Sequence, residues 1–131
     1  MRIRVEAAWR DAEGTPWVRV RTEAGVATAK WCGEPTAAGN EHHVEWTVDE
    51  DAVWGVNAHV VEDARSALTE DGERLVFRGR LQLDHDGVFT LSVGDWLVMF
   101  DGGTPPPGLA DGECVEVSAD RTSATLYPYL L

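Results

Sequence analysis

The sequence predicts an all-β fold, mainly antiparallel, built as one small barrel or sandwich with at most one short helix. Apolar and polar residues alternate along most of the chain, which is the pattern of strands with one buried face. Clusters of glycine, proline and aspartate interrupt this pattern at intervals typical of all-β domains. The 131 residues can bury a core and contain no dividing linker, so one domain spanning 1–131 is expected.

The first half of the chain supplies four expected strands. Alternation places Trp9 and Trp46 on the faces that should point into the core. A loop rich in glycine and proline is expected over residues 33–40. The four expected strands are 3–9, 17–22, 26–31 and 41–48.

The middle of the chain is acidic and less regular. Residues 34–73 contain eleven acids and a single base, Arg65, and are interpreted as a candidate insertion on the barrel. Within them, residues 53–61 are expected to be extended. Residues 62–68 are the one segment expected to form a helical turn.

Alternation returns clearly in the last part of the chain. Gly79 lies inside an apolar strand pattern, which indicates a bend, and the segment 84–87 predicts a hairpin turn. The last two strands are expected to pair with each other. Over residues 74–131 the order of strands and loops resembles the five-strand plan of an oligonucleotide/oligosaccharide-binding barrel, without a diagnostic motif. The expected strands are 75–83, 88–93, 96–100, 114–118 and 124–129.

Charge narrows the classes of partner. The chain has 23 acids and 11 bases, a formal charge of −12, which repels phosphate backbones and anionic membranes and attracts basic partners. Nucleic acid is therefore disfavoured without being excluded, and no membrane partner is expected. Ten of the bases are arginine, a bias typical of a GC-rich bacterial genome or a salt-adapted cytoplasm, in which acidity belongs to the organism.

Location and redox state are inferred from the residues after Met1 and from the cysteines. No apolar signal-like stretch comes after Met1, and no apolar run approaches the roughly 18 residues of a membrane helix. Cys32 and Cys114 are far apart and form no CxxC motif, which is typical of free thiols. A cytoplasmic protein without a cofactor is expected.

Aromatic and basic side chains are the most suggestive candidates for a binding site. Exposed indoles stack on bases, sugars or partner side chains, and alternating arginines form basic stripes. Arg19 and Arg21 could belong to such a stripe. The alternative is that the tryptophans fill the core and the arginines pair with the many acids. The candidate binding residues are Trp17, Trp31, Trp54, Trp96, Arg78 and Arg80.

Metal and nucleophilic chemistry have fewer candidates. Glu41, His43 and Glu45 share one strand face, and with His59 they are the candidates for a zinc, manganese or iron site. The alternative is a solvated strand face. The acidic segments 49–51 and 84–87 do not supply the ligand spacing of a calcium loop. Cys32 follows a strand, where a thiol can be exposed, but a nucleophilic role would require a histidine near it in space.

Three functions remain open, and binding is favoured over catalysis. The first is a non-enzymatic protein-interaction module, acting on a basic protein partner. The second is a single-stranded oligonucleotide-binding domain that uses Trp96, Arg78 and Arg80. The third is a small-barrel metalloenzyme that uses His43, Glu45 and His59.

Overall fold

The computed structural model describes residues 1–84 and 87–129 and confirms the predicted all-β class. Over these residues it contains strands and one short 3-10 turn, Arg121–Ser123. No helix within them has the length and apolarity required to cross a membrane. The strands are β1 (Arg2–Arg10), β2 (Pro16–Thr22), β3 (Gly25–Trp31), β4 (Glu41–Val48), β5 (Ala58–Val60), β6 (Ala67–Asp71), β7 (Arg74–Leu83), β8 (Val88–Val93), β9 (Trp96–Asp101), β10 (Cys114–Asp120) and β11 (Ala124–Tyr129).

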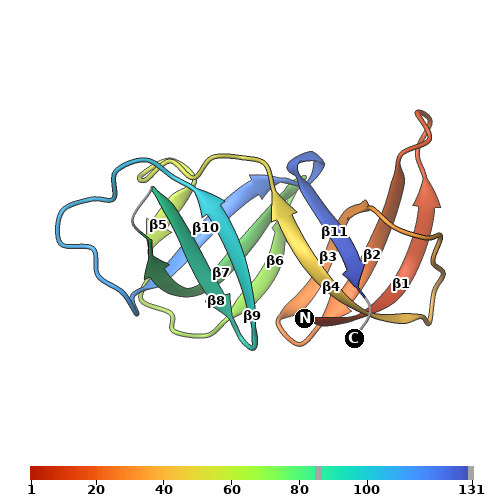
Figure 1. The fold of residues 1–131 in the computed structure, drawn as a ribbon, viewed down its shortest axis with the longest axis horizontal. Coiled ribbons are helices and arrows are strands. Elements are labelled where there is room, and N and C mark those ends of the chain that lie inside the picture. Colours follow the sequence, from red (N-terminus) through yellow and green to blue (C-terminus); the bar gives the residue numbers. More distant parts are fainter. Residues whose placement is uncertain (85–86, 130–131) are drawn as a thin grey trace.

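Five strands form a closed barrel, seen on the right of Figure 1. The order is β1-β2-β3-β11-β4, and β4 pairs back onto β1. All neighbours are antiparallel except β3 and β11, which are parallel. The interior is filled mainly by small and medium side chains: Ile3, Val5, Val18, Val20, Ala27, Ala29, Val44, Ala124 and Leu126.

The remaining strands form an open sheet, seen on the left of Figure 1. Its order is β5-β10-β7-β8-β9, and β6 also pairs with β7. Because β10 occupies one edge of β7, β6 and β8 share the other, and Gly79 lies where β7 passes from β6 to β8. A Cβ at Gly79 would collide with the Ser92 carbonyl oxygen, so this close approach requires glycine.

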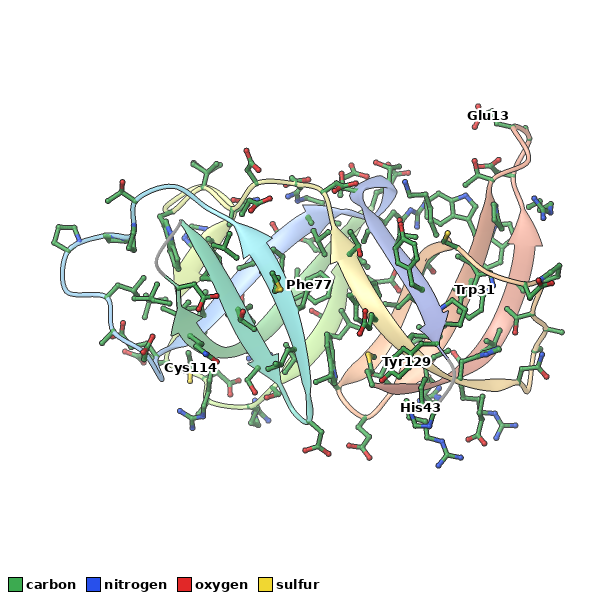
Figure 2. All side chains as sticks on the ribbon, in the orientation of Figure 1. Glu13, Trp31, His43, Phe77, Cys114 and Tyr129 are labelled. Atoms are coloured by element: carbon green, nitrogen blue, oxygen red, sulfur yellow. The ribbon has the colours of Figure 1, made fainter. Side chains whose placement is uncertain are left out.

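Barrel and open sheet share one aromatic core. The Phe77 ring on β7 lies 5.4 Å from the Trp46 ring on β4, and 6.3 Å and 5.7 Å from those of Trp96 and Phe100 on β9. Trp46 also stacks on Trp96 at 6.2 Å. Figure 2 shows Phe77 in the middle of the molecule, where the two sheets meet.

The prediction that Trp9 lies in the core is wrong. The β1–β2 register shifts between Val5 and Ala7, which marks a β-bulge. A bulge adds one residue to a strand and moves the subsequent side chains to the opposite face. Ala8 therefore faces the same side as its partner Val18, although Ala8 itself is exposed, and Trp9 faces outward and is 43% exposed.

The helical turn expected over 62–68 is also wrong. Residues 62–66 are irregular, and β6 begins at Ala67. Pairing with β7 and a hydrogen bond from the Leu68 N–H to the Ala24 carbonyl oxygen hold this segment extended. Tertiary pairing has overridden the local preference here. In the segment expected to be extended, 53–61, only β5 is a strand, beside an isolated bridge between Trp54 and Ala58.

The last two strands do not pair with each other. β10 pairs with β5 and β7 in the open sheet, whereas β11 lies between β3 and β4 in the barrel. The 3-10 turn between them redirects the chain, so the five-strand plan expected over residues 74–131 is not confirmed.

The acidic middle of the chain, residues 34–73, is not wholly an insertion on the barrel, because it contains β4, which closes the barrel. In the expected turn 84–87, residues 85 and 86 lie outside the described residues.

Candidate functional site

A hollow with a mixed apolar and acidic lining, between the barrel and β9, is the candidate binding site. It has a volume of about 410 Å³ and is open to solvent. Trp46 and Tyr129 contribute to it from the barrel, and Trp96, Leu97 and Met99 from β9. We call this hollow the β9 groove. Figure 2 shows Tyr129 beside His43 at the ends of β11 and β4, where their ring centroids are 6.1 Å apart.

The side chains of β9 are apolar on both faces from Trp96 to Phe100. Trp96, Val98 and Phe100 are buried against the sheet. Leu97 and Met99 alternate with them and are 62% and 61% exposed. A solvated strand face normally carries polar residues, so exposed leucine and methionine beside an apolar groove indicate a contact surface.

The backbone of β9 is paired on one side along its length. β8 pairs with residues 96–101, and the Asp101 carbonyl oxygen accepts a hydrogen bond from the Ala52 N–H on the opposite edge, at 2.7 Å. The N–H and C=O groups of alternate residues in a strand point to the same edge. The N–H and C=O groups of Leu97 and Met99 therefore face the edge of β9 opposite β8. The described part of the chain supplies no strand partner there.

Acidic side chains border the β9 groove. Glu45 from β4 and Asp95 from the β8–β9 turn both line it. Residues 32–131 as a whole carry nineteen acids and five bases. The groove therefore combines apolar contact, a free backbone edge and negative charge.

The four candidate tryptophans lie in different surroundings. Trp31 and Trp96 are buried, and the Trp31 Nε1–H donates to the Glu34 carbonyl oxygen at 2.8 Å. Trp54 packs on Phe89 with ring centroids 5.1 Å apart. Trp17 is half-buried. Of the four candidates, Trp96 is the one that borders the β9 groove.

The candidate arginines are engaged with their neighbours in the open sheet. Arg78 Nη1 lies 2.7 Å from Asp63 Oδ2, and Arg78 Nε lies 3.6 Å from Glu116 Oε1. Hydrogen bonds from Arg65, helped by the charge of Arg78, hold the pKa of Asp63 far below its usual value. Arg80 donates to the Gly112 carbonyl oxygen at 3.1 Å. Arg78 is thus committed to acids, as the alternative interpretation expected.

The metal candidates are not brought together. His43 and Glu45 lie on β4 of the barrel, whereas His59 lies on β5 of the open sheet and contacts the Val56 carbonyl oxygen at 3.1 Å. Glu41 pairs with Arg2 at 2.9 Å. No group of three histidine, cysteine or acidic residues within 1–84 and 87–129 has the arrangement of a metal site.

A polar joint centred on Glu50 was missed by sequence reasoning. Glu50 accepts hydrogen bonds from Arg74 at 2.6 Å, from the Asp120 N–H at 2.8 Å and from Asn57 at 3.0 Å. Partial burial raises the pKa of Glu50, but the bonds from Arg74 and Asp120 outweigh it and hold that pKa below its usual value. These contacts tie the end of β4 to the open sheet and are structural.

Comparison of the chain with protein-family models, curated proteins and solved structures finds no match.

Proposed function

We propose that the chain is a non-enzymatic protein-interaction module that binds an extended, basic segment of a partner protein along β9. The segment would pair with the free edge of β9 and add a strand to the open sheet. The observation that carries the proposal is the coincidence of the unpaired backbone of Leu97 and Met99 with their exposed side chains. Adding a strand to an exposed sheet edge is a recurring way of recognising peptides.

The chemistry of β9 supports this mode of binding. Proteins commonly protect an edge strand with lysine, proline or a bulge, because an exposed edge invites pairing with other chains. β9 contains no lysine or proline, and its register with β8 is regular from end to end. It therefore lacks these three protections, although β4 of the barrel packs beside part of β9.

Charge and shape support a basic partner segment with apolar side chains. Alternate side chains of an added strand point in opposite directions, so one set faces the apolar groove while the other faces outward. Glu45 and Asp95 border the groove, and none of the described bases lines it. Positive residues next to the apolar ones would pair with these carboxylates, speed association and exclude acidic partners.

The test uses a synthetic peptide of about six residues, a typical strand length, in which lysine alternates with valine or leucine. Calorimetric titration should show saturable binding that weakens as salt rises. The double substitution Leu97→Lys/Met99→Lys should abolish it. Val56→Lys is the matched control, because Val56 is 73% exposed and lies outside the β9 groove.

A second peptide separates strand pairing from simple charge attraction. N-methylation of alternate residues removes the backbone donors that face β9 and leaves charge and side chains intact. This peptide should bind at least tenfold more weakly. Equal binding by the methylated peptide, or equal loss on Val56→Lys, would contradict the proposal.

A further inference from the structure

We propose that the outer face of β1, β2 and β3 is a second binding site, and that its ligand is single-stranded nucleic acid. This face belongs to the barrel and does not include the β9 groove. It also lies apart from Trp96, Arg78 and Arg80 of the open sheet, which the sequence suggested for such a ligand. Local charge, a row of aromatic and basic side chains, and a pocket beside that row support it.

Local charge is close to balanced over these three strands, because Glu41 and Glu70 from outside them add to their four acids, at 2.9 Å from Arg2 and 2.8 Å from Arg19. Residues 1–31 contain six bases and four acids, whereas the remaining residues contain five bases and nineteen acids. Charges are screened beyond about 8–10 Å at physiological salt, so a ligand on this face responds mainly to the charges nearby. The net charge of −12 therefore does not decide what this face binds.

Two indoles and a lysine form one row across the strands. Trp9 on β1 is the cross-strand partner of Trp17 on β2, and Trp17 is the partner of Lys30 on β3. Cross-strand partners project from the same face of a sheet, with Cβ atoms about 5 Å apart. The bulge in β1 brings Trp9 to this outer face. Without the bulge, Trp9 would point to the inner face, as the alternation of the sequence predicted, and the row would not form.

Trp17 is held in position within the row. Its Nε1–H donates to Asp11 Oδ2 at 2.9 Å, and this bond is the main reason why the pKa of Asp11 lies below its usual value. The Arg121 guanidinium lies 5.9 Å from the Trp17 ring centroid. A fixed indole loses little conformational freedom when a base stacks on it, and a cation beside it can approach a phosphate.

Two further arginines lie along β2 on the same face. Arg19 lies 2.8 Å from Glu70, and Arg21 lies 3.0 Å from Glu6. Both arginine side chains remain substantially exposed, and ion pairs of this kind contribute little net free energy. A phosphate can therefore replace or share these carboxylate contacts at small cost.

A pocket of about 160 Å³ opens beside the row, at one end of the barrel. Ala8, Val18 and Trp31 line it from the inner side of the strands, and Trp9, Trp17, Pro35 and the basic Arg10 also border it. Indoles with an adjacent cation suit a single unstacked base and its phosphate. Bases in a duplex are stacked on each other and cannot enter, which is why the ligand is single-stranded.

The experiment titrates the whole protein with fluorescein-labelled DNA and RNA of about 12 nucleotides at low salt. Binding should appear as increased anisotropy of the label and quenching of tryptophan fluorescence.

Variants test the row of side chains. Trp9→Ala should weaken binding about tenfold. Trp9→Tyr should retain most of the affinity, because a base can stack on the tyrosine ring. Lys30→Gln should reduce the slope of log affinity against log salt by about 0.7. Arg65→Gln removes an equally positive, 86% exposed side chain from the loop before β6 and should change neither quantity.

Three competing ligands complete the test. Heparin carries charge without bases, poly-glutamate stands for an acidic protein, and duplex DNA keeps its bases stacked. Each should compete at least tenfold less well than the single strand. Absence of binding at low salt, equal competition by any of the three, or equal weakening by Arg65→Gln would overturn the proposal.

Discussion

The closed barrel and the open sheet are built from similar alternating strands, but they leave different groups available for binding. Closure gives each barrel strand a neighbour on both sides, so the barrel presents mainly outward side chains to a ligand. The open sheet ends at β9, whose backbone is free on one side at Leu97 and Met99 within the described part of the chain. The barrel therefore suits recognition by side-chain face, and the open sheet suits recognition by strand addition.

The two regions also differ in charge and in core. The barrel interior is lined largely by valine and alanine, whereas the open sheet is filled by Phe77, Phe89 and Phe100. Six of the eleven bases lie in the first 31 residues, and nineteen of the 23 acids lie after them. The two proposed sites lie on different regions of the molecule, so their ligands would not compete for one surface.

The largest expected effect tests whether the barrel depends on the open sheet. Phe77→Ala removes a fully buried ring that contacts Trp46 of the barrel and should destabilise the chain by about 3–5 kcal/mol. Since the core is shared, urea unfolding monitored by tryptophan fluorescence and by far-ultraviolet circular dichroism should show one coincident transition at lower urea. Separate transitions, with the barrel signal unchanged, would show that the regions are independent.

An intermediate effect is expected at the polar joint between the regions. Glu50→Gln keeps the shape of the side chain but removes the charge that Arg74 and the Asp120 N–H stabilise, at a cost of about 1 kcal/mol at neutral pH, discounted for partial exposure.

The same substitution should change the pH dependence of stability. The pKa of Glu50 is lowered in the folded state, so its contribution is complete above the ordinary pKa of 4.5. The contribution falls as pH drops below that value and is lost below the folded pKa. As pH falls through 4.5 toward the lower, folded-state pKa, the wild type should therefore lose more stability than Glu50→Gln. Parallel curves would show that Glu50 is not held ionised by the joint.

Much of the secondary structure could be predicted because alternation reports which side of a strand is buried. The boundaries of 41–48 and 88–93 agree with β4 and β8, and Val18, Val20 and Trp46 are buried as expected. Alternation does not report which strands pair. β11 returns from the end of the chain to close the barrel beside β3, a long-range contact for which the local pattern carries no signal.

The candidate sites were harder to predict for related reasons. The bulge after Val5 adds one residue without any glycine to mark it, so alternation assigns Trp9 to the wrong face. Leu97 and Met99 did carry a signal, because residues 96–100 are apolar at both even and odd positions. That continuous pattern indicates a strand covered on both faces, and the second cover is absent from the described residues.

The smallest expected effect tests whether the exposed side chains of β9 serve binding or hold the fold together. Leu97→Lys/Met99→Lys changes two exposed side chains on a strand that keeps its pairing with β8. Stability should therefore change by no more than about 0.5 kcal/mol per substitution, which thermal unfolding can measure. The variant should also aggregate less at high concentration, because lysine on an edge strand disfavours pairing with other chains. A loss comparable to that of Phe77→Ala would mean that Leu97 and Met99 hold the fold together, and that β9 is not the open side of the molecule.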